Sequence, residues 1–85
     1  MLIRITQTTE GPTTVLKIDG RLGGAGVAEL ARVAHAAVPP LVLDLTHLQQ
    51  ADADGLALLQ ALARAGAHLR GVSPYIALLL DRPQP

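Results

Sequence analysis

Hydrophobic and polar residues alternate at the start of the chain, and this pattern predicts two β-strands. Residues 2–6 alternate at every second position and are rich in β-forming types, as expected for a half-buried strand. A second strand is expected from Thr13 to Asp19, with Gly20 at its end. Because glycine and proline in the segment Thr9–Pro12 interrupt regular structure, the two strands should form an antiparallel hairpin.

The spacing of apolar residues becomes helical after the loop Gly23–Gly26. Apolar residues recur at steps of three and four between Val27 and Val38, which predicts an amphipathic helix. Pro39 and Pro40 should stop this helix, since neither residue can donate the next backbone hydrogen bond. A short apolar strand, Leu41–Leu45, is expected directly afterwards.

An acidic turn opens the next helix. A polar connector, Thr46–Ala51, leads to the turn Asp52-Ala53-Asp54-Gly55. The leucine- and alanine-rich segment that follows predicts a helix from about Gly55 to Ala65. Gly66 is a suitable residue to end it, because glycine adopts the left-handed conformation common at helix C-termini.

A brief strand and a short helix are expected in the last part of the chain. The strand should run from His68 to Val72, and the helix from Pro74 to about Asp81. Ser73 fits the N-cap position, and proline fits the first position of a helix.

The order of these elements predicts an α/β fold. Strand–helix–strand units cross over with right-handed geometry, so helices between sequential parallel strands should share one face. The sheet should be small and mixed, with an N-terminal hairpin followed by sequential parallel strands, helices packed mainly on one face and the other face open. The residues expected to face the helices are Ile3, Ile5, Leu16, Ile18, Leu41, Leu43, Leu45 and Leu69. Those expected on the open face are Arg4, Thr6, Lys17, Asp19, Asp44, His68 and Arg70.

Composition narrows the class of protein. The 85 residues are enough for one small domain, expected over residues 1–85, and the absence of cysteine excludes disulfides and thiolate metal sites. Seven basic residues balance seven acidic ones, and Tyr75 is the only aromatic residue, so no nucleic-acid partner is expected. No segment has the apolar length of a signal peptide or a membrane span. We therefore expect a cytoplasmic protein without direct membrane insertion.

The acidic turn is the sharpest local signal. A helix start leaves backbone N–H groups unpaired, and with the helix dipole they favour negative charge. Asp52 or Asp54 is expected to cap the helix. The Asp-x-Asp-Gly pattern also resembles the nucleophile motif of haloacid-dehalogenase-type phosphatases, but those enzymes place it directly after an apolar strand, and here residues 47–50 intervene. A calcium loop does not fit, because no glutamate closes the loop.

Almost the full chain resembles STAS domains, which occur in anti-sigma-factor antagonists and in the tails of sulphate transporters. The similar segments are Gly20-Arg21-Leu22 at a strand end, the central strand Leu41–Leu45, the acidic turn before a Gly-Leu-Ala-Leu-Leu helix, and Gly71-Val72-Ser73-Pro74 before a short terminal helix. In that family the turn usually carries Asp-Ser-Ser-Gly or a close relative, and a partner kinase phosphorylates the hydroxyl residue just before the glycine. The modification releases the domain from its partner.

The chain departs from that pattern at the phosphorylated position. The equivalent residue is Asp54, and neither Asp54 nor Ala53 carries a hydroxyl, so the phosphoryl switch cannot operate there. The resemblance implies a non-catalytic interaction module of the anti-sigma-factor-antagonist type, with Asp52, Ala53, Asp54, Gly55 and Leu56 as the partner-binding residues. The implied partner is an anti-sigma factor of the histidine-kinase-like ATPase type. Asp54 would either mimic the modified state in part or only cap the helix.

Two other functions remain open. One is the STAS subunit of a lipid-transporting ABC complex, which sits on the transporter ATPase. The other is a small nucleotide-binding or Asp-dependent phosphatase domain that uses the Gly23–Gly26 loop or the aspartate pair. The leucine-rich segment 76–80 also leaves room for a homodimer. The three histidines, His35, His47 and His68, match no metal-binding spacing, so no metal site is expected. No cofactor is assigned.

Overall fold

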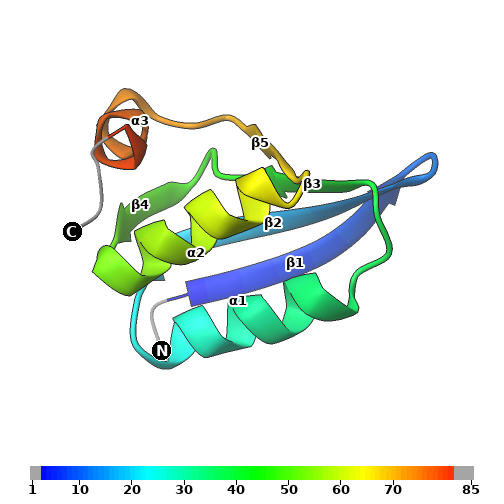
Figure 1. The fold of residues 1–85 in the computed structure, drawn as a ribbon, viewed down its shortest axis with the longest axis horizontal. Helices are drawn as coiled ribbons and strands as arrows, with labels where there is room; N and C mark the ends of the chain where they lie inside the picture. The colour runs from blue at the N-terminus through cyan, green and yellow to red at the C-terminus, as the bar shows by residue number, and fades with distance from the viewer. Residues whose placement is uncertain (1–2, 82–85) are drawn as a thin grey trace.

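A computed structural model describes residues 3–81, which form a five-stranded mixed sheet and three helices (Figure 1). The elements follow in the order β1 (Ile3–Glu10), β2 (Thr13–Leu22), α1 (Ala25–Ala36), β3 (Leu41–Asp44), β4 (Leu48–Ala51), α2 (Ala53–Arg64), β5 (His68–Arg70) and α3 (Pro74–Leu80). The predicted α/β class is confirmed, with one strand more than expected. No helix in the described part of the chain is long and apolar enough to cross a membrane.

The predicted antiparallel hairpin is present, and it is longer than expected. Pairing extends to Glu10 opposite Thr13, so the loop contains only Gly11 and Pro12. Gly11 has a φ of 60°, which a type II′ turn requires at the first loop position and which glycine adopts readily. The tight turn therefore lengthens both strands at this end. Leu2, which the sequence pattern also assigned to the first strand, lies outside the described residues.

β2 continues to Leu22 and does not end at Gly20, and the supposed connector before the acidic turn contains a strand. Thr14 to Lys17 of β2 pair in parallel with β3, and Gly20 to Leu22 pair in parallel with β4. Because β2 has ten residues and β3 only four, the far half of β2 needs another partner for its backbone groups. β4 supplies it and buries Leu48.

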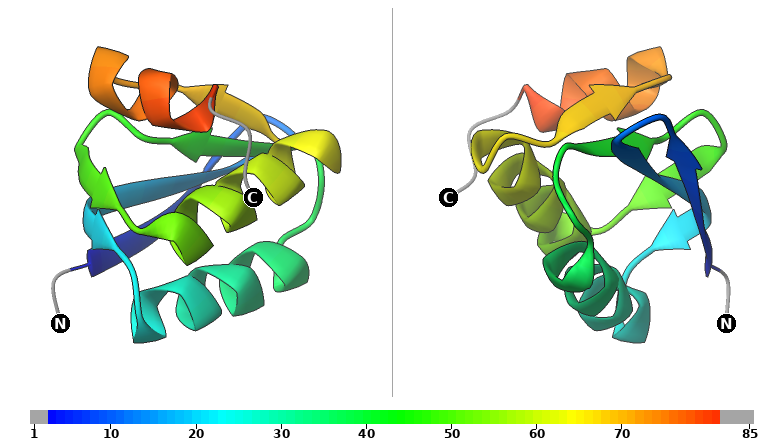
Figure 2. Two further views of the ribbon diagram at one scale, coloured as in Figure 1. Left: turned by 60° about the vertical axis from the view of Figure 1, so that its left-hand side comes forward. Right: turned by 90° about the vertical axis from the view of Figure 1, so that its right-hand side faces the viewer.

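The helices α1 and α2 lie side by side on one face of the sheet (Figures 1 and 2). α1 begins at Ala25 and ends at Ala36, two residues earlier at each end than predicted, and Gly26 is therefore helical. Its early end follows from Pro39, because the residue before a proline is disfavoured in helical geometry and the chain is already extended at Ala37.

The third helix, α3, packs against β4 and α2. Its start follows the prediction, since the Ser73 hydroxyl accepts a hydrogen bond from the Ile76 N–H at 3.2 Å and Pro74 occupies the first turn. Ile76 is fully buried and joins the central core cluster. That cluster contains Leu16, Ile18, Leu22, Leu30, Ala34, Leu43, Leu45, Leu48, Leu59 and Ile76.

The two faces of the sheet differ as the alternation predicted. The residues expected toward the helices are fully buried or packed against the core: Ile3, Ile5, Leu16, Ile18, Leu41, Leu43, Leu45 and Leu69. The strand order β1-β2-β3-β5 agrees with a hairpin followed by sequential parallel strands, and β4 is the addition, pairing with β2.

Candidate functional site

The Asp52 carboxylate holds the start of α2 in place. Its Oδ1 accepts a hydrogen bond from the Gly55 N–H at 2.7 Å, and its Oδ2 accepts a longer one from the Gly24 N–H at 3.4 Å. The Asp52 N–H donates to the Leu22 carbonyl oxygen at 2.9 Å. One residue therefore joins the end of β2, the start of α1 and the start of α2. The acidic turn is thus an N-cap, and α2 begins at Ala53 and not at Gly55 as predicted.

Asp54 lies in the first turn of α2, and its carboxylate forms no hydrogen bond with any other residue in 3–81. Ala53 and Asp54 are both exposed, and within residues 3–81 neither backbone N–H of these two residues donates to a protein acceptor. The arrangement gives a small acidic surface in which two exposed carboxylates lie next to two unpaired amide donors. The helix dipole favours the negative charge of Asp54 at this position.

Gly55 and Leu56 are buried, which corrects the expectation that both contribute to an exposed docking surface. A Cβ at position 55 would lie 2.7 Å from the Leu22 carbonyl oxygen, so only glycine allows α2 to approach β2 this closely. Leu56 packs inward with 7% of its surface exposed. These two residues position the acidic surface, and Asp52, Ala53 and Asp54 are the ones that solvent reaches.

A hollow of about 280 Å³ lies beside Asp52. It is lined by Arg21, Leu22, Gly23, Gln50, Ala51, Asp52 and Tyr75. Arg21, Gln50 and Tyr75 were missed in the sequence analysis. Two of the lining residues belong to β4, which the sequence pattern did not reveal, and the only available signal was that Tyr75 is the sole aromatic residue in the chain.

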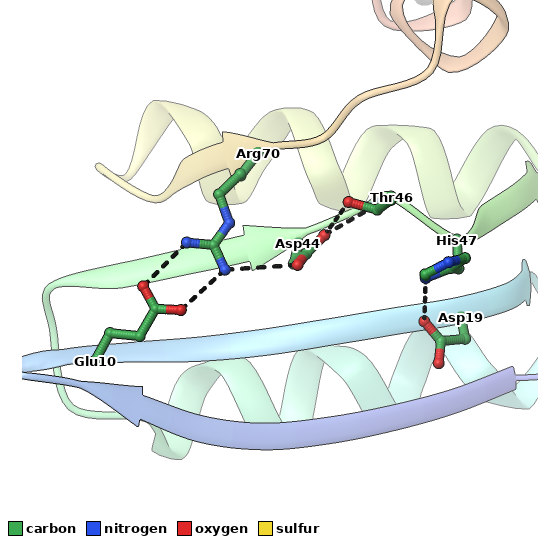
Figure 3. Close-up of polar contacts among 6 residues, drawn as sticks. All are labelled: Glu10, Asp19, Asp44, Thr46, His47 and Arg70. Carbon is green, nitrogen blue, oxygen red and sulfur yellow. Dashed lines mark hydrogen bonds and ion pairs between the residues drawn. The ribbon is translucent and has the colours of Figure 1, made fainter.

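Ion pairs on the open face of the sheet link strands that are distant in sequence (Figure 3). The Arg70 guanidinium contacts both Glu10 carboxylate oxygens at 3.1 and 3.2 Å, and it lies 3.5 Å from Asp44. Asp44 and Arg70, both expected on the open face, lie close enough to form an ion pair. Glu10 was not anticipated, because the sequence pattern assigned it to a turn. His47 Nδ1 lies 3.9 Å from a carboxylate oxygen of Asp19.

The Gly23–Gly26 segment does not form an open glycine loop. Gly26 belongs to α1, and Gly24 is its N-cap without a side-chain hydrogen bond. Within residues 3–81, His, Asp and Glu side chains form no group of three that could hold a metal ion.

Comparisons with known proteins agree with this architecture. A family model described as "Mlab, STAS domain" matches residues 5–81. The chain belongs to the STAS-domain family. A crystal structure of the STAS domain of an anti-sigma-factor antagonist from Rhodobacter sphaeroides is similar in fold, with a TM-score of 0.65 and 18% sequence identity. The similarity covers 82% of this chain and 87% of that chain. Comparison with curated proteins gives no match.

The Asp52 N-cap should contribute measurably to the stability of this STAS domain. Replacing Asp52 with alanine is expected to lower the free energy of unfolding by about 0.5–2 kcal/mol, because the Gly55 N–H loses its acceptor. Asp54→Ala is the matched control, and its loss should be clearly smaller, because Asp54 accepts no hydrogen bond within residues 3–81 and only its interaction with the helix dipole is removed. Urea denaturation of both variants compares them. Equal losses would contradict the capping role of Asp52.

The contacts of the Asp44 carboxylate on the open face should make the STAS domain less stable in acid. The Thr46 hydroxyl and N–H donate to the Asp44 carboxylate at 2.6 and 3.0 Å and, with Arg70 nearby, hold its pKa below the ordinary value of 3.8. Since the folded-state pKa is the lower one, this contribution is complete above pH 3.8 and is lost as the pH falls through the folded-state value. Denaturation midpoints measured in increasing acid should fall, and less steeply in Asp44→Asn. An identical pH dependence in the variant would contradict this assignment.

Proposed function

We propose that the chain is a non-catalytic protein-interaction module of the anti-sigma-factor-antagonist type, and that residues 1–85 act as one domain. The partner docks on the acidic surface formed by Asp52, Ala53 and Asp54 at the start of α2. The observation that supports this most is that Asp54 is exposed there beside two unpaired amide donors, at the position that the family resemblance assigns to phosphorylation. Members of this family are generally non-catalytic.

The proposed partner is an anti-sigma factor of the histidine-kinase-like ATPase type, in a cytoplasmic signalling pathway that regulates transcription. Asp54 takes the place of the phosphorylatable residue. A carboxylate carries about one negative charge at neutral pH, against about 1.5–2 for a phosphoserine, and has fewer acceptor oxygens. The negative charge at position 54 therefore does not depend on modification, and binding does not depend on modification either.

An enzymatic use of the aspartate pair has less support. Both Asp52 oxygens accept backbone hydrogen bonds, so this carboxylate is occupied in building the helix start. A phosphatase or nucleotide-binding domain would bind nucleotide with magnesium in a calorimetric titration. We expect no heat of binding.

One observation favours a second candidate, the STAS subunit of a lipid-transporting ABC complex. Such a subunit sits on an ATPase without necessarily being phosphorylated, and the missing hydroxyl at positions 53 and 54 suits it. The genes beside this one separate the candidates: a sigma factor and a kinase, or a transporter ATPase and permease.

Replacing Asp54 with arginine tests the docking surface. The variant reverses the exposed charge without removing the Asp52 cap, so it should weaken capture of the ATPase partner while the circular dichroism spectrum stays unchanged. Arg64→Glu reverses an exposed charge at the other end of α2 and is the matched control, with capture expected to be unaffected. Equal capture by Asp54→Arg and the unmodified protein would contradict the proposal.

A further inference from the structure

The outer edge of β1 has backbone groups that no described strand uses. β1 ends the strand order of the sheet, and it pairs only with β2. In β2 the amides of Thr14 and Gly20 donate away from β1, toward the Pro40 and His47 carbonyl oxygens. Backbone N–H and C=O groups of successive strand residues point to opposite sides. The odd-numbered residues of β2 therefore form the hydrogen bonds to β1. Their partners on β1 are even-numbered, so the N–H and C=O groups of residues 3, 5, 7 and 9 point outward.

This edge lacks two of the features that usually prevent strand pairing, a short length and a proline or lysine. β1 spans eight residues and contains neither proline nor lysine, and natural edge strands are often shortened or carry these residues. Beside it lies a hollow of about 350 Å³ lined by Ile3, Ile5, Ala25 and Glu29. α1 thus leaves Ile3 and Ile5 only half-buried on the core-facing side of the strand. A strand added at this edge would shield both.

The charges at the two ends of β1 indicate which strand could be added at this edge. Arg4 and Glu10 point to the same open face, since they stand opposite Asp19 and Thr13 of β2. Arg4 is exposed and makes no ion pair with any residue in 3–81. When a second β1 is laid antiparallel with Gln7 opposite Gln7, Arg4 of each copy stands opposite Glu10 of the other. We propose that two copies of this chain pair through β1 in this register and form one continuous sheet.

The register is consistent with the geometry of antiparallel strands. Residues 5, 7 and 9 supply the hydrogen-bonded pairs between the copies, so Arg4 and Glu10 fall in non-hydrogen-bonded pairs, where opposite side chains lie closer together. Opposite charges directly across two strands stabilise the pairing, and like charges destabilise it. A shift of one residue on each copy, with Thr6 opposite Thr6, removes both charge contacts. This surface shares no residue with Asp52, Ala53 and Asp54, so it stands independently of the proposed docking site.

Sedimentation of charge-reversal variants tests the dimer. The parent protein carries Arg70→Gln, so that the ion pair between Glu10 and Arg70 within one copy does not enter the comparison. At high concentration the parent and the unmodified protein should sediment at twice the monomer mass of 8.8 kDa. Arg4→Glu and Glu10→Arg should each raise the dimer dissociation constant about tenfold, since each turns two attractive contacts into repulsive ones. The double variant Arg4→Glu/Glu10→Arg should restore the parent value.

Controls separate this interface from others. Arg64→Glu reverses an exposed charge on α2 and should leave the dissociation constant unchanged. Gln7→Pro blocks an outward N–H without touching the bonds to β2, and should give a monomer with an unchanged circular dichroism spectrum. A protein that is monomeric at every concentration overturns the proposal and leaves the edge to a strand of another protein. A dimer that single reversals do not weaken, or that the double variant does not restore, overturns it as well.

Discussion

Replacing Leu59 with alanine is expected to lower the free energy of unfolding by about 2–5 kcal/mol. Leu59 lies on the buried side of α2, has no exposed surface and belongs to the central core cluster. Truncation removes apolar contacts and leaves a cavity that the neighbouring aliphatic side chains can fill only in part. Small domains have a total stability of about 5–15 kcal/mol, so the variant should lose a substantial part of its stability.

Leu78→Ala is the matched control for this core prediction. The same atoms are removed from α3, where Leu78 is 57% exposed, and the expected change is within about 0.5 kcal/mol. Urea denaturation followed by circular dichroism measures both variants. Similar losses in the two would contradict the assignment of Leu59 to the core.

Replacing Gly55 with alanine is expected to loosen the start of α2. The added Cβ would lie 2.7 Å from the Leu22 carbonyl oxygen and 2.9 Å from the Leu22 Cγ, so the helix must move away from β2. That movement also stretches the hydrogen bond from the Asp52 N–H to the same Leu22 oxygen. Overpacking of this kind costs about 1–3 kcal/mol, against a helix-propensity gain of about 1 kcal/mol for alanine over glycine.

Gly26→Ala isolates the effect of this close approach. It brings the same gain in helix propensity within α1, but the atoms nearest to its Cβ belong to the Ile3 side chain, at 3.0 Å, and a side chain can turn aside. Thermal unfolding of both variants should show Gly55→Ala to be the less stable by about 1–3 kcal/mol. Variants of equal stability would contradict the packing of α2 on the end of β2.

Local patterns in the sequence predicted most of the fold, because they act over a few residues. Alternation in residues 3–5 and 16–18 assigned the two faces of the sheet correctly. Ser73 before Pro74 correctly marked the start of α3, since capping involves only the first turn of a helix. The acidic turn was correctly located at a helix start for the same reason.

Features that depend on distant partners could not be predicted in this way. β4 exists because β2 is longer than β3, and only tertiary pairing reveals that difference. Gly55 and Leu56 are buried because α2 packs on Leu22, thirty-three positions before Gly55 in the sequence. The hollow beside Asp52 brings together Arg21, Gln50 and Tyr75, which have no common sequence pattern. Local reasoning thus found the exposed residues at the start of α2, and it could not find the buried residues that position them.

Site-specific photo-cross-linking tests the proposed docking surface most directly. A photoreactive residue in place of Ala53 lies at the exposed start of α2 and leaves both aspartates intact, and one in place of Ala28 lies on the exposed side of α1 as a control. We predict that position 53 cross-links in cells to an ATPase of the histidine-kinase-like type, identified by mass spectrometry, and that position 28 does not. Cross-linking of that ATPase at position 28 but not at position 53 would contradict the account.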